Sequence, residues 1–229
     1  MITAILLAAG QGLRLKGTVT PKQFLRIQGK KLYQFTLETF VKHKKIDQII
    51  LVVNEKALPE VQDEVKLWAK KKSIHVIVGG KTRQESSYQG LIYAQLHTKP
   101  DYVLIHDVAR PLLTTYLIDQ LVGALKSYSA ITLGRHVNDS LFVVDEQATL
   151  HNYVSKKDIY LTQTPQAFQF QTILEAHEHA KSLKIKTASD DASLLTLMGK
   201  KVHVIPGSRM NFKIVNEDDL SLLKALLKR

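Results

Sequence analysis

The sequence has no cysteine among its 229 residues, and this absence excludes disulfide bonds and thiolate metal sites. Acidic residues are also few: 21 Asp and Glu stand against 32 Lys and Arg, which leaves a formal net charge of +11. No apolar run approaches the roughly 18 residues of a membrane-spanning helix. The N-terminus lacks a basic segment followed by an apolar stretch and a cleavage site, so we expect a cytoplasmic protein with no membrane partner.

The excess of positive charge favours phosphorylated substrates or polyanionic partners. Many of the lysines lie in short runs at expected helix ends, where they are solvated and complement the helix dipole. No helix carries a sustained basic stripe, and no stretch interleaves basic with aromatic residues. We therefore predict no nucleic-acid partner, and keep a non-catalytic nucleotide or nucleic-acid binder as a more remote alternative.

Strand-like and helix-like segments alternate over the first 133 residues. The run 48–53 (QIILVV) is continuously apolar after its first residue, which is typical of a parallel strand covered on both faces. Regular alternation predicts an α/β fold with a Rossmann-like, doubly wound, mostly parallel sheet. Ligands bind such sheets at the carboxyl ends of the strands. The expected strands are 5–8, 48–53, 74–78, 102–106 and 130–133, and the expected helices are 32–42, 57–71, 83–96 and 116–126.

The alternation breaks after residue 134. Two short strand-like pieces flank a polar turn at 145–147, and this pattern predicts a β-hairpin. A hairpin of this length cannot bury its own core, so we expect a protruding β-arm at about 136–158 that packs against another subunit. The remainder completes a single domain over 1–229, with helices at 172–183 and after 189–191, a strand at 202–205 and a terminal helix from Asp218.

A glycine-containing loop follows the first strand. The run 8–12 (AAGQG) comes before Arg14 and the 21–23 segment (PKQ). Glycine lets a backbone approach an anion closely, and two cations beside such a loop suit a triphosphate. The third glycine of a dinucleotide fingerprint would fall at Leu15 and is missing, which disfavours a hydride-transfer enzyme. The alternative is a surface loop with solvated lysines.

Asp107 ends an apolar strand, a position where a carboxylate can hold Mg²⁺ through one or two oxygens. Arg110 can bind a phosphate with two parallel hydrogen bonds. The alternative is an internal ion pair between these two residues. His106 is more typical of a core residue than of a catalyst, and 189–191 (SDD) is typical of a helix N-cap. The sequence has no serine-hydrolase elbow, no GxxxxGK[ST] loop and no zinc-type histidine pair.

Several of these motifs occur together and in one order along nearly the whole chain. They are 8–14, 21–25, 78–80 with 83–86, 106–111, 139–140, 163–168, 189–193 and 211–214. By this set the chain resembles the 2-C-methyl-D-erythritol 4-phosphate cytidylyltransferase family. The resemblance implies transfer of CMP from CTP to 2-C-methyl-D-erythritol 4-phosphate in non-mevalonate isoprenoid synthesis. It also implies Mg²⁺ or another divalent cation as cofactor, and a homodimer with an exchanged β-arm.

The resemblance also assigns site residues. Contacts with CTP would come from Ala8, Ala9, Gly10, Gly12, Gly80, Lys81, Ser86, Asp107 and Val108. The catalytic cations would be Arg14, Lys22 and Lys213. The acceptor would meet Asp107, Arg110, Ser140, Lys156, Thr164 and Lys213, partly across the dimer. Mg²⁺ would be held mainly by the CTP phosphates, with Asp107 as the candidate protein ligand.

This chain departs from the family pattern on its arm. Ser140 stands where threonine is usual, and Lys156 where arginine is usual; lysine offers a point charge in place of a planar fork. Ribitol 5-phosphate cytidylyltransferases share most of these motifs and are the alternative function. They commonly carry Val-Arg-Pro where this chain has Ala109-Arg110-Pro111, so the sequence favours the methylerythritol enzyme.

The implied reaction explains why the sequence shows no motif for a catalytic nucleophile or a general base. A phosphate monoester has a second pKa of about 6, so its dianion is already a nucleophile at neutral pH. The reaction then requires charge neutralisation and in-line alignment, and no general base.

Overall fold

The computed structural model describes residues 1–10 and 20–228. Seven strands form the central sheet in the order β11-β7-β10-β6-β1-β4-β5. All pairs are parallel except those of β10, which runs antiparallel to both of its neighbours. The strands are β1 (Ile2–Ala8), β4 (Gln48–Val53), β5 (Ser73–Val78), β6 (Tyr102–Asp107), β7 (Ala130–His136), β10 (Tyr160–Gln169) and β11 (His203–Pro206).

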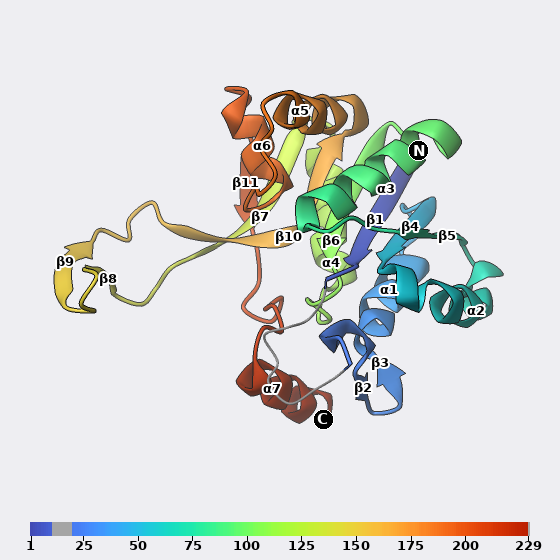
Figure 1. Cartoon of the computed structure of the whole chain (residues 1–229), viewed down its shortest axis with the longest axis horizontal. Helices are drawn as coiled ribbons and strands as arrows, with labels where there is room; N and C mark the ends of the chain where they lie inside the picture. Colours follow the sequence, from blue (N-terminus) through green and yellow to red (C-terminus); the bar gives the residue numbers. More distant parts are fainter. Residues whose placement is uncertain (11–19, 229) are drawn as a thin grey trace.

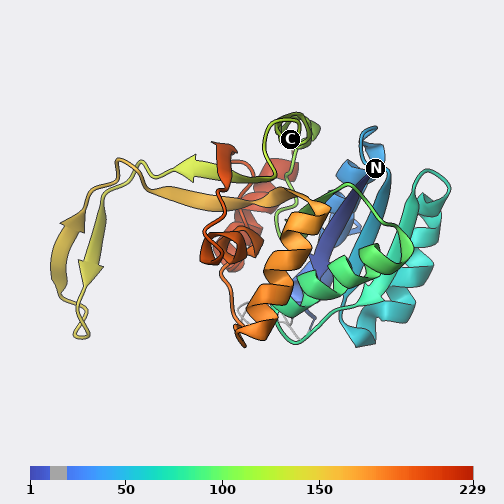
Figure 2. The same cartoon turned by 90° about the horizontal axis from the view of Figure 1, so that it is seen from above.

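Helices cover both faces of this sheet (Figures 1 and 2). The helices are α1 (Leu32–Lys42), α2 (Leu58–Ala69), α3 (Arg83–His97), α4 (Thr115–Ala124), α5 (Phe170–Ser182) and α6 (Asp191–Leu197). Alternate residues of a strand point to opposite faces, so Leu6 packs with α1, α2 and α4, whereas Ile5 packs with α3, α5 and α6. The predicted doubly wound α/β fold is therefore confirmed.

The hydrophobic pattern of the sequence predicted the bounds of most helices and strands to within a few residues. The helix at 32–42 and the strand at 48–53 have the predicted bounds, and β6 extends one residue further, to Asp107. The terminal helix α7 (Glu217–Leu227) begins one residue before the predicted Asp218. It packs against the short strand β2 (Arg26–Ile27), which pairs with β3 (Lys30–Lys31), through a small apolar cluster that includes Ile27, Ile214 and Leu223. That cluster anchors the segment between β11 and α7.

Strand β10 was not predicted. Its middle is polar and contains Pro165, and proline within a sheet is normally confined to edges and bulges. Here the pairing of β10 with β7 shifts register between Gln163 and Gln166, so a bulge accommodates the proline. Gln166 is fully buried, and its amide bonds Thr132 and Asp190, both distant in sequence. These hydrogen bonds allow a polar residue to be buried in the strand, so β10 lacks the apolar pattern by which strands are predicted from sequence.

The predicted arm is a two-stranded hairpin of β8 (Leu141–Val144) and β9 (Leu150–Val154). It lies well away from the sheet at the end of two long connections (Figures 1 and 2). Its turn closes where Asp145 and Thr149 pair through their backbones, at the predicted 145–147 position. None of the described helices is long and apolar enough to cross a membrane.

Candidate nucleotide-binding site

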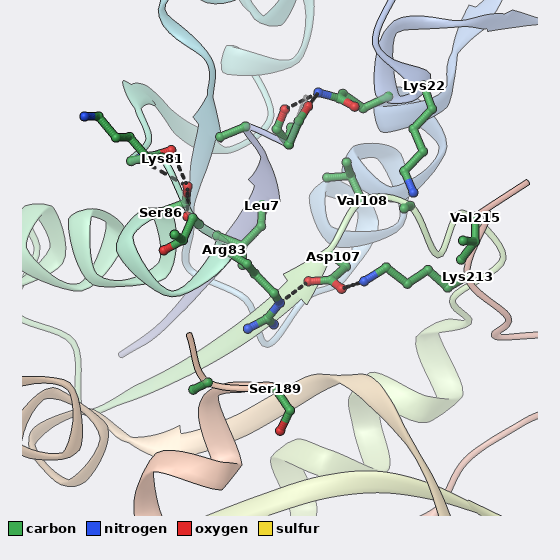
Figure 3. A pocket seen from close by; sticks show the side chains of 18 residues that line it. Leu7, Lys22, Lys81, Arg83, Ser86, Asp107, Val108, Ser189, Lys213 and Val215 are labelled. Carbon is green, nitrogen blue, oxygen red and sulfur yellow. Dashed lines mark hydrogen bonds and ion pairs between the residues drawn. The ribbon is translucent and has the colours of Figure 1, made fainter. Parts of the chain in front are cut away.

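The candidate site lies where the connections from neighbouring strands diverge. β1 lies between β4 and β6, and the carboxyl ends of β1 and β6 meet with Leu7 opposite Asp107. Doubly wound sheets bind ligands at such a switch point. A cavity of about 520 Å³ lies there (Figure 3). Its described lining includes Ala8, Ala9, Gly10, Lys22, Gly80, Lys81, Arg83, Ser86, Asp107, Val108, Ser189 and Lys213.

The 21–23 segment holds the end of β1 and the residues up to Gly10. A short 3₁₀ turn, η1 (Lys22–Phe24), begins after Pro21 and buries the side chain of Gln23. The Gln23 amide donates to the carbonyl oxygens of Ala8 at 2.8 Å and Gly10 at 2.5 Å. With these carbonyls held by Gln23, the end of β1 keeps a fixed path along the cavity wall.

A second wall follows β5. A Cβ added to Gly79 would lie 2.6 Å from the Cβ of Ala9, so only glycine lets this turn approach the first loop. Thr82 and Glu85 then form a capping box at the start of α3. Ser86 Oγ accepts from the Gly80 amide at 3.2 Å and donates to the Thr82 carbonyl at 2.9 Å. The predicted base-pocket residues therefore form one rigid turn.

Asp107 lies at the centre of the cavity between two cations (Figure 3). Arg83 Nε donates to its Oδ1 at 2.9 Å, and Lys213 Nζ donates to its Oδ2 at 2.6 Å. Burial opposes ionisation of this carboxyl, but the charges of Arg83 and Lys213 outweigh burial and hold its pKa well below the usual range. Asp107 is therefore a fixed anion that orients two cations beside the glycine loops.

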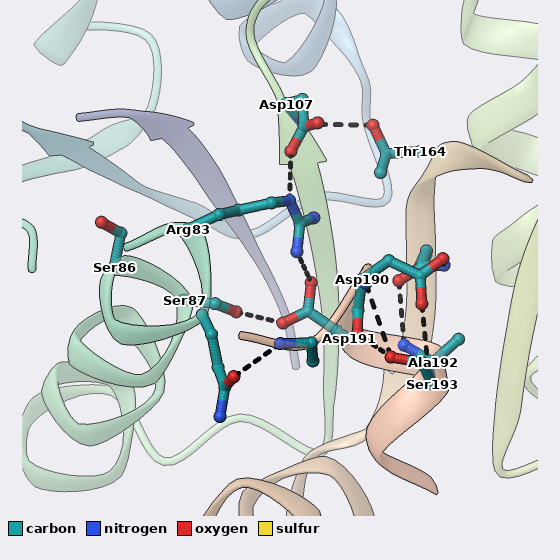
Figure 4. A network of polar contacts seen from close by, with 12 residues as sticks. Arg83, Ser86, Ser87, Asp107, Thr164, Asp190, Asp191, Ala192 and Ser193 are labelled. Atoms are coloured by element: carbon teal, nitrogen blue, oxygen red, sulfur yellow. Dashed lines mark hydrogen bonds and ion pairs between the residues drawn. The ribbon is translucent and has the colours of Figure 1, made fainter. Parts of the chain in front are cut away.

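The same network continues away from the cavity through Asp191 (Figure 4). Arg83 Nη1 donates to Asp191 Oδ2 at 2.8 Å, and Asp191 Oδ1 accepts from Ser87 at 2.5 Å and lies 3.0 Å from Nε2 of His177. Burial opposes the charged forms of both Arg83 and Asp191. Their attraction nevertheless raises the pKa of Arg83 and lowers the pKa of Asp191. Both groups stay charged at neutral pH, which gives Asp107 a rigid support.

His106 faces the protein interior, next to the site. Its Nε2 lies 3.2 Å from the Arg110 carbonyl, which can only accept, so the ring proton is assigned to Nε2. Nδ1 then accepts from the Thr164 hydroxyl at 3.1 Å, and that hydroxyl accepts the Asp107 amide at 3.1 Å. Burial lowers the pKa of His106 to about 3, so the ring is neutral. His106 and Thr164 thus fix the backbone of Asp107.

Lys213 comes from the segment between β11 and α7, which is anchored on both sides of it. The Asn211 side chain donates to the Thr164 carbonyl at 2.9 Å, and the Ile214 amide donates to the Ala109 carbonyl at 2.8 Å. Lys22 Nζ donates to the Ile214 carbonyl at 2.6 Å. The predicted catalytic lysines therefore reach one cavity from segments that are directly bonded to each other.

The remaining predicted residues lie in different places. Gly12 and Arg14 are outside the described residues. Ser140 and Lys156 are exposed at the base of the arm, where the Lys156 amine donates to the Asn138 carbonyl. The alternative of an Asp107–Arg110 ion pair is wrong, because Asp107 pairs with Arg83 and Lys213.

The structure supports only a limited role for the protein in holding a metal. Within residues 1–10 and 20–228 no group of three His, Asp or Glu side chains could hold an ion, and Asp107 is the one carboxylate in the described cavity wall. Mg²⁺ commonly uses one carboxylate, several waters and substrate phosphates. The donor set therefore fits an ion carried mainly by a triphosphate, for which Asp107 would be the available carboxylate among the described lining residues.

Sequence reasoning placed Arg83 at the carboxyl end of the third strand without giving it a role, and it gave Asp191 and Gln23 no role in the site. The PKQ motif contained the signal for Gln23, but its carbonyl partners lie in a different segment. An N-cap was predicted within 189–191, and Asp190 is that cap because it accepts from the Ser193 amide, whereas Asp191 turns inward to Arg83. An acidic pair before a helix does not reveal which of its members is buried.

An α/β sheet with glycine turns and lysines around Asp107 in its switch-point cavity is suited to binding a nucleotide and transferring its phosphoryl group. The family model described as 2-C-methyl-D-erythritol 4-phosphate cytidylyltransferase (IspD) matches residues 2–229. The chain belongs to this family, whose members are CTP-dependent cytidylyltransferases.

Individual relatives agree with that assignment. The chain is 34% identical over 227 residues to the enzyme of that name from Clostridium botulinum (strain 657 / Type Ba4), covering 99% of this chain and 97% of the relative. It is 36% identical over 227 residues to the one from Bacillus mycoides (strain KBAB4), covering 99% and 98%. The crystal structure of the 2-C-methyl-D-erythritol 4-phosphate cytidylyltransferase from Thermus thermophilus matches with a TM-score of 0.81 at 30% identity, covering 100% of both chains.

Proposed function

We propose that this chain transfers CMP from CTP to 2-C-methyl-D-erythritol 4-phosphate, releasing pyrophosphate and forming 4-diphosphocytidyl-2-C-methyl-D-erythritol. Family membership supports the substrates. The observation that carries the chemistry is the array of Lys213, Asp107 and Arg83 beside Lys22 in one switch-point cavity. This array supplies fixed charge and contains no activated nucleophile, as transfer to a phosphate dianion requires.

In the proposed reaction a phosphate oxygen of the acceptor attacks the α-phosphorus of CTP, and the bond from that phosphorus to the pyrophosphate oxygen breaks. Lys213 stabilises the charge that develops on the α-phosphoryl group. Its ammonium has three donors and Asp107 takes one, so two remain for phosphate oxygens. Lys22 and Arg14 bind the triphosphate. The turn formed by Gly80, Lys81 and Ser86 receives the cytosine.

Two further groups belong to the proposed reaction. Mg²⁺ bound to the triphosphate would neutralise charge on its oxygens, next to Asp107. Neutral His106, with both ring nitrogens hydrogen-bonded, serves to position Asp107 and takes no proton from the substrate. Thr164, the predicted acceptor contact, lies next to Asp107, whose backbone amide donates to the Thr164 hydroxyl.

The proposed active form is a homodimer in which the arm supplies Ser140 and Lys156 to the partner's site. Both arm strands are exposed along their length, apart from partly buried Leu141, and they carry large apolar side chains. Phe142 is 54% exposed and Tyr153 is 67% exposed. Apolar surface of this kind on a projecting hairpin is typical of a subunit contact.

The decisive experiment measures pyrophosphate release from CTP and Mg²⁺ with methylerythritol 4-phosphate, ribitol 5-phosphate or no acceptor. We expect release with the first acceptor only. Preference for ribitol phosphate would establish the alternative acceptor. Binding of CTP without pyrophosphate release under any of the three conditions would point to a non-catalytic binder.

The roles of the two lysines are tested by Lys22→Ala and Lys213→Ala, with Lys66→Ala as the control on an exposed surface of α2. Each site variant should lose about 3 kcal/mol of transition-state stabilisation, which is roughly 100-fold in kcat/KM. Turnover close to that of the wild type in both variants would contradict the assignment.

A further inference from the structure

A second cavity of about 500 Å³ adjoins the nucleotide cavity, and Lys213 lines both. Its walls come from β7, β10, the loop after β6 and the segment after β11. They include Arg110, Arg135, Asp139, Thr162, Arg209 and Lys213. Four of these side chains are cationic and one is acidic, so the cavity is suited to an anion.

The arginines of this cavity differ in what they already bind. Arg110 donates to the carbonyl oxygens of Asn211 at 2.9 Å and Thr162 at 3.2 Å. Arg135 and Arg209 have no ion pair or side-chain hydrogen bond with any residue in the described part of the chain. Their guanidinium donors are thus all without a protein partner in that part of the chain, whereas Arg83 and Arg110 each bond through two nitrogens and leave only Nη2 and Nε, respectively, without one.

The backbone fixes where Arg135 can reach. It lies on β7 opposite Leu161 of β10, in the continuous part of that ladder. Arg209 lies two residues before Asn211, whose side chain is bonded to the Thr164 carbonyl. Two arginines on anchored backbone, flanking a concave surface, can each present a planar fork to phosphate oxygens.

We propose that Arg135 and Arg209 bind the phosphate group of the acceptor and thereby set its KM in this chain. The inference rests on the proposed function. The phosphate's outer oxygens bind the two guanidinium groups, while its attacking oxygen faces Lys213 at the opening into the nucleotide cavity. The planar guanidinium groups can each donate two parallel hydrogen bonds to the phosphate, which the ammonium group of Lys156 cannot do.

The test uses Arg135→Gln, Arg209→Gln and the double variant, with Arg26→Gln as the control at an exposed position on β2. Each single change should raise the acceptor KM roughly 10- to 100-fold, as expected for a lost charge-assisted contact. The KM for CTP should stay within two-fold and kcat within three-fold. Replacement by lysine should restore part of the acceptor KM.

A binding measurement separates this inference from the reaction itself. Calorimetric titration of the full-length dimer with methylerythritol 4-phosphate, and with inorganic phosphate as the minimal probe, should give binding that the double variant loses. If the wild type binds phosphate through these arginines but transfers no CMP, the reaction fails and the anion site stands.

Three results would overturn the inference. One is an acceptor KM within two-fold of the wild type in both single variants. Another is a fall in kcat with unchanged acceptor KM. The third is dissociation of the dimer with unchanged acceptor binding, which would assign the two arginines to the subunit contact.

Discussion

Replacing Asp191 with asparagine removes one charge from the buried network behind the active site. The Asp191 side chain is 1% exposed and that of Arg83 is 25% exposed, so Arg83 cannot regain full hydration when its partner is lost. Removing one partner of a buried ion pair typically costs about 3–5 kcal/mol. Arg83 keeps Asp107, and the asparagine keeps hydrogen-bonding capacity, so we expect the lower value of about 3 kcal/mol.

A loss of that size lowers the melting temperature of a chain of this length by about 6–12 °C. Urea unfolding measures the free energy, and Asp63→Asn is the matched control. Asp63 and Lys66 pair at the surface with about three quarters of each side chain exposed, so the control should change by less than about 0.5 kcal/mol. An Asp191→Asn variant within 1 kcal/mol of the wild type would refute the reasoning.

The pH dependence gives a second readout of this prediction. The folded-state pKa of Asp191 is lowered, so its stabilising contribution is present above the ordinary carboxyl pKa of about 3.9. The contribution is lost as the pH falls from that value through the lower folded-state pKa. The stability difference between wild type and Asp191→Asn should therefore shrink below about pH 4.

The other predictions concern the glycine turn, the buried histidine and the arm. Gly79→Ala places a Cβ 2.6 Å from that of Ala9, so it should weaken CTP binding at least 10-fold by titration, whereas Gly123→Ala meets no atom within 4 Å and should leave binding unchanged. Burial lowers the pKa of His106 to about 3, so stability should rise with pH between 3 and 6.5. His106→Gln should reduce that slope by up to about 1.4 kcal/mol per pH unit in urea unfolding at pH 4.5–6.5, and an unchanged slope would contradict the assigned neutral ring. Tyr153→Ser should shift the proposed dimer toward monomer in sedimentation, and a dimer as stable as that of the wild type would contradict the proposed contact through the arm.

The hydrophobic pattern of neighbouring residues was sufficient to predict most strands of the sheet, but it did not predict β10. The run 48–53 predicted its strand because apolar continuity is a property of neighbouring residues. β10 gave no such signal, because the polar residues in its middle become buried only through partners such as Thr132 and Asp190. Hydrogen bonding across distant segments makes a polar strand stable, and sequence periodicity does not record it.

The sequence by itself determined the kinds of groups at the site. Its motifs named Lys22, Asp107 and Lys213, together with the glycine turns that approach a phosphate. The absence of cysteine excluded thiolate chemistry, and the alternation of strands and helices predicted the doubly wound sheet. Lys213 came from the family resemblance, and the other features follow from residue identity and short-range pattern, which do not depend on knowledge of contacts.

Only the tertiary structure decided how those groups are paired. Asp107 binds Arg83 and Lys213, which are 24 and 106 residues away in sequence, in preference to nearby Arg110. The structure also turned Asp191 inward to Arg83, and left Arg135 and Arg209 facing a cavity beside Lys213. The strength of an ion pair depends on the distance between the charges and on their burial. The order of the strands in the folded sheet sets both of these quantities.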